Sequence, residues 1–306
     1  FAGSYELVIV GRIMQGFGGG VFSPLVPILL TTASPNRPGR VLIVWGSVAG
    51  YVAAFAPLIY GSVLGAYGWR LAFVIFAVVA ITALAIVHRS HIRDDPASAT
   101  KPRPSYSILL RSRDLWVMFG YVFCTYGAIT YYLFKLPLWL ADNEFEVVSI
   151  GLTLSLIWLS FSGVSTLLRN SVDEPHVRGI LLAAPVLIAC GFPLAYLCQD
   201  VTCLVLSSIL VGSGLACSNA PSTQLILKFA PKGMSAVSAS LDITFARLGG
   251  VATVAFLAQS VFAYAVLAII SMSLIAFLCA LVAGKRFDAA DLCEPSLSGV
   301  DSVCRR

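Results

Sequence analysis

The feature that most constrains this chain is a series of long, almost uninterrupted apolar runs. An α-helix needs about 20 consecutive apolar residues to cross the hydrocarbon core of a bilayer. Nine runs of about that length lie near residues 5–31, 41–67, 69–88, 115–140, 147–168, 179–198, 201–228, 234–258 and 260–284. Only 11% of the 306 residues are charged, against about 25% in ordinary soluble domains. The sequence therefore predicts an all-α, polytopic membrane helix bundle and excludes a soluble fold.

The loop charges predict how these helices are oriented. No run alternates apolar and polar residues over about ten positions, so helices are the spanning elements, and consecutive helices must alternate in direction. One set of alternate loops holds sixteen of the twenty lysines and arginines: Arg37, Arg40, Arg89, Arg93, Lys101, Arg103, Arg111, Arg113, Arg169, Arg178, Lys228, Lys232, Lys285, Arg286, Arg305 and Arg306. The loop after the fourth run instead carries Asp142, Glu144 and Glu146. Because basic loops stay cytoplasmic, we expect the first set and the C-terminus inside, in a plasma (inner) membrane.

One long loop divides the runs into two unequal groups. Residues 89–114 are rich in Pro, Arg and Asp, and we expect a cytoplasmic linker there. Residues 1–88 then form a partial N-terminal half-bundle of three spans, residues 115–284 a six-helix bundle, and residues 285–306 a cytoplasmic tail. With the C-terminus inside, nine spans place the first residue outside, so we expect an odd number of further helices upstream. Two equal halves need three more, and two six-helix halves are a recurrent plan of secondary transporters.

The most specific local pattern lies in the first run, where residues 11–20 read GRIMQGFGGG and Pro24 follows. Arg12, Gln15 and Gly16 are spaced i, i+3 and i+4, so they share one helical face. An arginine inside a membrane costs about 2.5 to 3.5 kcal/mol on insertion scales and usually lines a pathway or pairs with an acid. We expect this face to point into the bundle. The alternative is that Arg12 lies near the outer helix end and snorkels to the interface.

These residues resemble the major facilitator superfamily, and specifically its drug:proton antiporters. The fourth helix of that family carries R-x-x-Q-G with a proline downstream, which Arg12, Gln15, Gly16 and Pro24 match. The second run is similar to the fifth-helix antiporter motif, whose core reads G-P-x-x-G-G. Pro57 and Gly61 match that core, whereas Ala56 and Tyr60 stand where the family has glycines.

Further stretches follow the family's order along the chain. Gly68-Trp69-Arg70 with Phe73 resembles the opening of the sixth helix, and Arg247-Leu248-Gly249-Gly250 resembles a stretch of the eleventh. Gly163, Arg169 and Arg178 are similar to a degenerate cytoplasmic loop motif between the eighth and ninth helices. The resemblance covers the chain as helices four to twelve. It implies a secondary active transporter, proton-coupled export of a drug-like molecule by alternating access, and a part for Arg12 in proton coupling.

Few other ionisable residues lie inside the predicted spans. Asp242 is the only carboxylate well inside one, which makes it the default candidate for proton or cation coupling; the alternative is a place at the cytoplasmic helix end. Arg247 lies five residues further, about 140° around the helix, so the two are poorly placed to pair and each needs another partner or water. Lys135 either snorkels to the outer surface or lines a cavity.

Small and aromatic residues supply the remaining site candidates. Small residues four apart let helices cross closely. The candidate crossing or gating positions are Gly16, Gly20, Gly46, Gly50 and Gly61 and, from the family motif, Pro57. The candidate cavity-lining side chains are Tyr126, Tyr131, Tyr132, Lys135 and Trp158. We expect about half of the aromatic ones to face lipid or the interface instead.

Nothing in the sequence resembles catalytic machinery. No H-E-x-x-H, G-x-S-x-G or P-loop spacing occurs, and the eight cysteines lack metal-site spacing, which favours packing residues and free thiols. We therefore expect no enzyme activity, cofactor, metal or nucleic acid, and as partners the bilayer, a small-molecule substrate and protons. The alternatives are an importer of a sugar or organic ion, a polytopic membrane enzyme or receptor, and a non-functional fragment. An importer predicts several polar cavity side chains; an enzyme or receptor predicts histidine or carboxylate clusters at the membrane surface, or seven helices.

Overall fold

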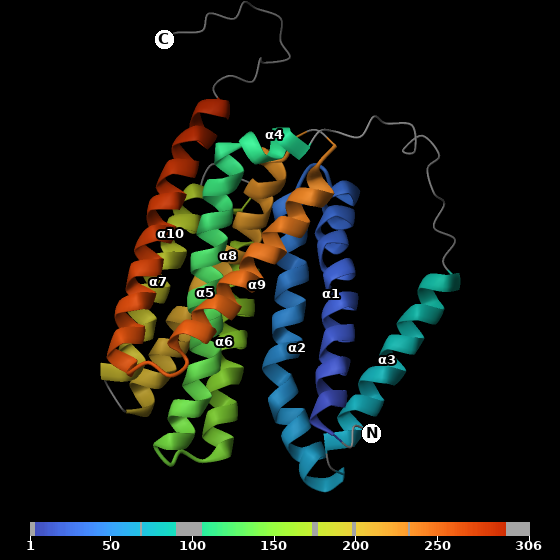
Figure 1. The fold of residues 1–306 in the computed structure, drawn as a ribbon, viewed down its shortest axis with the longest axis vertical. Helices are drawn as coiled ribbons and strands as arrows, with labels where there is room; N and C mark the ends of the chain where they lie inside the picture. The colour runs from blue at the N-terminus through green and yellow to red at the C-terminus, as the bar shows by residue number, and fades with distance from the viewer. Residues whose placement is uncertain are drawn as a thin grey trace, which may run out of the picture.

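The computed structural model describes residues 4–67, 69–89, 106–172, 177–197, 200–231 and 233–291. Within these ranges the regular elements are all α-helices, most of them running side by side (Figure 1). They are α1 (Tyr5–Ala33), α2 (Pro38–Tyr67), α3 (Trp69–Arg89), α4 (Tyr106–Arg111), α5 (Arg113–Asp142), α6 (Val147–Leu168), α7 (Val177–Leu197), α8 (Val201–Phe229), α9 (Ser235–Leu257) and α10 (Phe262–Asp291). The predicted all-α bundle is confirmed.

Eight of the described helices are long and apolar enough to cross a membrane, namely α1, α2 and α5 to α10. In α3, which corresponds to the third predicted run, the apolar stretch Phe73–Arg89 is shorter. Two boundaries differ from those expected. The last helix continues past residue 284 to Asp291, because Lys285, Arg286 and the alanines after them favour a helix even in water.

The second difference is α4, a short helix inside the stretch expected to be a linker. It lies at the upper end of the bundle (Figure 1). Its Leu109 is buried in the core, whereas Ile108 and Leu110 are exposed. The indole nitrogen of Trp116, in the first turn of α5, donates to the carbonyl oxygen of Leu110 over 3.1 Å. The end of the predicted linker is therefore ordered against the helix that follows it.

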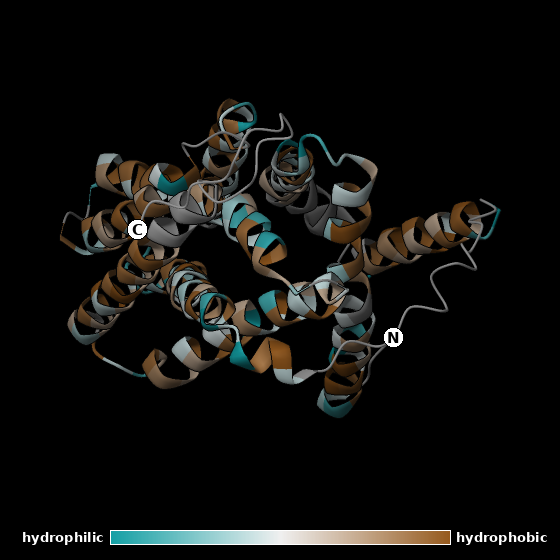
Figure 2. Cartoon of the chain, turned by 90° about the horizontal axis from the view of Figure 1, so that it is seen from above, coloured by the Kyte–Doolittle hydropathy of each residue, from teal (hydrophilic) through white to brown (hydrophobic). Residues whose placement is uncertain are grey.

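The core of the molecule lies among α5 to α10. One cluster of buried side chains joins α5, α6, α7, α8 and α10, and a second joins the other ends of α5, α7, α8 and α10 and includes Met234 beside α9. At the second, the fully buried Tyr121 of α5 donates its hydroxyl to the carbonyl oxygen of Leu181 in α7 over 3.1 Å. Seen from above, hydrophobic residues also cover the outside of the bundle (Figure 2), as lipid-facing helices require.

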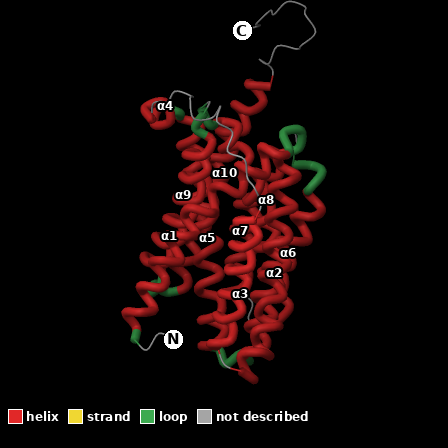
Figure 3. The backbone as a smooth tube through the Cα atoms, turned by 90° about the vertical axis from the view of Figure 1, so that its right-hand side faces the viewer, coloured by secondary structure: helices red, strands yellow, loops and turns green. Residues whose placement is uncertain are grey.

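The helices α1 and α2 attach to this group at two places. The main contacts are between α2 and α6 and between α1 and α9. The third helix diverges from the bundle (Figure 1) and packs mainly against α2. Figure 3 shows the same arrangement from the side, with short loops between the long helices. The contact between α1–α2 and α5–α10 is therefore the boundary between two groups of helices.

The cysteines correct one expectation. Cys124, Cys190, Cys217 and Cys279 are free thiols, as expected. Cys203, in the first turn of α8, is instead disulfide-bonded. It lies at the bundle end that carries the loop between α5 and α6, because successive long helices alternate in direction (Figure 1).

Candidate functional site

A cavity of about 440 Å³ lies where α1 and α2 face α5, α6, α8 and α9. Its volume is within the range of small-molecule sites, about 300 to 1,000 Å³. The residues that line it are Ser23, Pro27, Trp45, Tyr126, Ile129, Thr130, Leu133, Trp158, Leu215, Asn219, Thr223, Ala239, Asp242, Ile243, Ala246 and Arg247. Most are apolar or aromatic, so a solute held here contacts mainly hydrocarbon and rings, with a few polar groups at defined places.

Two aromatic side chains face the cavity from opposite groups of helices. Trp45 comes from α2 and Trp158 from α6, and the Trp158 ring packs edge-on against Phe161 at 5.9 Å between centroids. Indole and phenol rings offer both apolar area and a face that attracts cations. Trp158 and Tyr126, two of the candidate cavity residues, line this cavity.

The charged groups of the cavity come from α9. Asp242 is 6% exposed, and its carboxylate accepts a hydrogen bond of 2.8 Å from the Thr223 hydroxyl of α8. Arg247 lines the same cavity and is exposed within the described chain. A carboxylate among apolar helices is costly unless hydrogen bonds, a positive charge or a proton compensate it. Thr223 supplies one such hydrogen bond. Because Asp242 and Arg247 are poorly placed to pair with each other, Asp242 was expected to need a partner other than Arg247.

A second polar pair joins α5 to α8. The Tyr126 hydroxyl donates to Asn219 Oδ1 over 2.8 Å, and the Ser222 hydroxyl donates to the backbone carbonyl of Asn219 over 3.1 Å. Asn219 and Thr223 were not among the sequence candidates. The signal was present, since residues 218–223 read SNAPST inside an otherwise apolar run and put two polar side chains four apart on one helical face.

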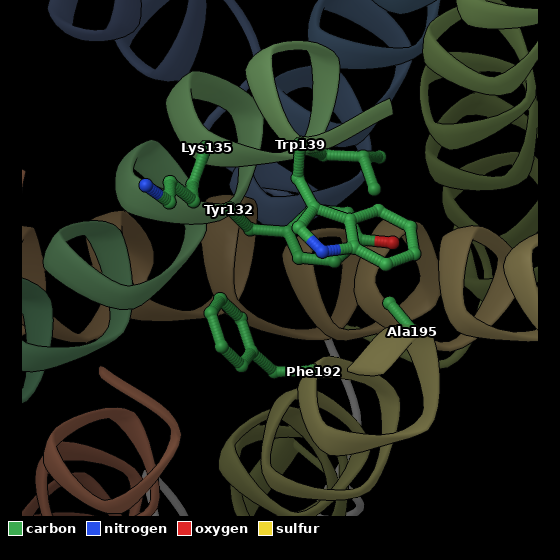
Figure 4. A pocket seen from close by; sticks show the side chains of 6 residues that line it. Tyr132, Lys135, Trp139, Phe192 and Ala195 are labelled. Atoms are coloured by element: carbon green, nitrogen blue, oxygen red, sulfur yellow. The ribbon is translucent and has the colours of Figure 1, made fainter. Parts of the chain in front are cut away.

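The other proposed cavity aromatics pack in the core instead. Tyr131 donates to the carbonyl oxygen of Leu257 over 3.1 Å and stacks on Phe192. The Tyr132 hydroxyl shares a hydrogen bond of 2.7 Å with Ser207. Tyr132 and Lys135 border only a void of about 10 Å³, where the Lys135 amino group points away from the rings (Figure 4). None of these three side chains lines the large cavity, and the hydroxyls of Tyr131 and Tyr132 bond to the end of α9 and to α8 instead.

The arginine and glutamine of the first helix do not face the cavity. Arg12 donates to Gln15 Oε1 over 3.0 Å, and both are exposed. A Cβ atom at Gly16 or Gly20 would have no described neighbour within 4 Å. This face of α1 was expected to point into the bundle, but α1 meets the described helices only through its second half, around the buried Pro24 and Pro27.

The glycines of the second helix are in close contact with α6 and α8. A Cβ atom at Gly46 would lie 3.3 Å from Asn219 Nδ2, and one at Gly50 would overlap Ser162 and Phe161. The Ser162 hydroxyl donates to the carbonyl oxygen of Ser47 over 3.0 Å. The surroundings of Pro57 and Gly61, further along α2, lie outside what the structure describes.

The fold and the cavity together define an integral, multi-pass helical membrane protein with an internal site of small-molecule size. The family model of the Major Facilitator Superfamily matches residues 1–254. The chain therefore belongs to the Major Facilitator Superfamily, a family of membrane transporters rather than enzymes.

Curated relatives include proteins named for drug resistance. The "Multidrug resistance protein B homolog" of Mycobacterium tuberculosis is 38% identical over 94 residues, which are 30% of this chain and 17% of that protein. The "Tetracenomycin C resistance and export protein" of Streptomyces glaucescens is 26% identical over 175 residues, 57% of this chain and 30% of that protein. The "Uncharacterized MFS-type transporter YhcA" of Bacillus subtilis is 29% identical over 87 residues, 28% and 16% respectively. The chain thus spans less than a third of the length of each.

Proposed function

We propose that this protein is a secondary active transporter that exports small drug-like molecules in exchange for protons. The observation that carries the proposal is the cavity of about 440 Å³, which residues of both helix groups line. A site shared between two groups of helices can be exposed to either side of the membrane when the groups rock against each other. The aromatic and apolar lining suits a drug-like solute, and the names of two relatives, which refer to resistance and export, support efflux.

The proposed coupling group is Asp242. It is the carboxylate that lines the cavity, and Arg247 on the same helix supplies a positive charge to the same space. Binding and release of a proton at Asp242 would change the net charge of the cavity in each cycle. Arg12 and Gln15 remain proposed coupling residues by resemblance, and that role needs a partner that is not among the described residues.

The proposed moving parts are the half-bundles predicted from the sequence, residues 1–88 and 115–284, joined by the linker at 89–114. Gly46 and Gly50 lie at the contact between α2 and α6, where close approach lets two helices pivot without side chains in the way. The proposed orientation puts the basic loops and the C-terminus in the cytoplasm of a bacterial-type inner membrane. The disulfide-bonded Cys203 at the opposite end supports this orientation, since disulfides persist outside the reducing cytosol.

Efflux of a fluorescent lipophilic cation tests the proposal. Cells that express the complete open reading frame containing this chain should accumulate less dye than empty-vector cells, and a protonophore should remove the difference. Arg12→Ala should also remove it, while Arg37→Ala, a change at an exposed loop arginine, should not. Equal dye accumulation with and without expression, under an intact proton gradient, would contradict export.

A further inference from the structure

The side-chain amide of Asn219 lies where α8, α5 and α2 meet. Its oxygen accepts the hydrogen bond from Tyr126 of α5, over 2.8 Å. Its nitrogen faces Gly46 of α2, close enough that a Cβ atom there would stand 3.3 Å away. Asn219 itself belongs to α8 and lines the cavity. It therefore connects a residue of the α1–α3 group with a hydroxyl that faces the solute space.

Glycine at position 46 leaves room for this amide. The other neighbour of a Cβ atom there would be Phe161 Cζ at 3.6 Å, an ordinary van der Waals distance. The close approach at this position is therefore to Asn219. At Gly50, one helical turn further, an added Cβ atom would meet Phe161 and Ser162 instead. Substitutions at Gly46 and Gly50, which share one face of α2, therefore disturb different neighbouring residues.

We propose that Asn219 is a positioning residue that links closure of α2 against α8 to the orientation of Tyr126 in the cavity. With α2 in place, the amide is confined so that Oδ1 faces Tyr126 and Nδ2 faces Gly46. When α2 moves away, the amide loses that confinement, and the Tyr126 hydroxyl becomes free to turn toward a solute. The inference rests on the proposed transport function, and it adds a residue through which the contact between the helix groups changes the solute site.

The test is a double-mutant cycle between Gly46→Ala and Asn219→Ala. The added methyl group should displace the amide by a few tenths of an ångström and weaken its bond to Tyr126. The released Tyr126 hydroxyl can then turn toward the solute, which should lower the KM for transport about five- to tenfold. In the Asn219→Ala background the methyl group has room, so Gly46→Ala should add no further change. Tyr126→Phe, which releases the amide, should likewise make Gly46→Ala nearly neutral.

Gly50→Ala is the matched control. It impairs the same contact through Phe161 and Ser162, so Asn219→Ala should not relieve its effect. Gly151→Ala, where no described atom lies within 4 Å of an added Cβ, should leave KM unchanged. If the role of Asn219 is purely structural, Asn219→Ala still makes room for the methyl group, but Gly46→Ala should keep its full effect in the Tyr126→Phe background, where the amide remains. That persistence would overturn the inference, as would additive effects of Gly46→Ala and Asn219→Ala or relief of Gly50→Ala by Asn219→Ala.

A second measurement needs no solute. Deuterium uptake at residues 44–52 of purified protein should rise in Gly46→Ala and return to the wild-type level when Asn219→Ala or Tyr126→Phe is added. If the wild-type protein moves no solute, the proposed function fails, and the uptake cycle still decides whether Gly46, Asn219 and Tyr126 are coupled. If transport is present but neither cycle shows relief, the inference fails alone.

Discussion

At the residue scale, the cavity places one carboxylate and one guanidinium in a largely apolar space. Asp242 is buried and held by Thr223 from the neighbouring helix, whereas Arg247 is exposed within the same cavity. Under the proposed function, the carboxylate takes up and releases a proton beside this guanidinium. This arrangement explains how a site lined mainly by rings and aliphatic side chains can still respond to a change of charge.

Replacement of Asp242 by asparagine distinguishes a role in proton coupling from a role in solute binding. Asn keeps the size of the side chain and an acceptor for Thr223, so solute affinity should change by about fivefold or less. Gradient-driven accumulation should be lost, because the amide cannot take up and release a proton. Counterflow in everted vesicles without a gradient measures the first effect, and accumulation under a pH gradient measures the second.

The matched control is Asp142→Asn, which removes an exposed carboxylate at the end of α5 and should alter neither quantity. Full gradient-driven transport in Asp242→Asn would exclude Asp242 as the proton carrier.

At the element scale, apolar runs predict helices well because a run of spanning length has few other structures open to it in lipid. It is harder to predict from the sequence which side of each helix faces the interior of the bundle. Tyr131 and Tyr126 are five apart on α5, yet only Tyr126 reaches the cavity. Apolar residues on all sides of a spanning helix leave no hydrophobic stripe to mark the buried face. Short polar runs are the better guide, as Asn219 and Thr223 show.

Gly249 tests how tightly α9 packs against α5. A Cβ atom there would overlap the backbone of Phe123, which cannot rotate out of the way as a flexible side chain can. Gly249→Ala should therefore destabilise the protein by about 1 to 3 kcal/mol, seen as a lower unfolding temperature in detergent. Gly179→Ala, in a helix but with no described atom within 4 Å of an added Cβ, should leave that temperature unchanged or raise it slightly. Equal effects of the two changes would contradict this packing.

At the scale of the whole molecule, loop charges and helix directions agree. The loop after α1, the short helix α4, the loop after α6 and the end of α10 lie at one end of the bundle (Figure 1). These are the segments in which sequence reasoning placed the basic residues. The contact between α2 and α6 could not be predicted in the same way, because it depends on side chains more than a hundred residues apart, such as Ser162 and Ser47.

Reporter fusions test the orientation that follows. The basic residues predicted from the sequence to lie in the loops at this end resist translocation, so we expect that end to stay in the cytoplasm in every molecule. Green fluorescent protein fused after Arg306 should fluoresce, and alkaline phosphatase fused there should be inactive. Alkaline phosphatase inserted after Asn143, in the loop between α5 and α6, should be active, because it folds only where its disulfides can form. The reverse pattern would invert the bundle, placing Cys203 in a reducing compartment and turning the proposed export into import.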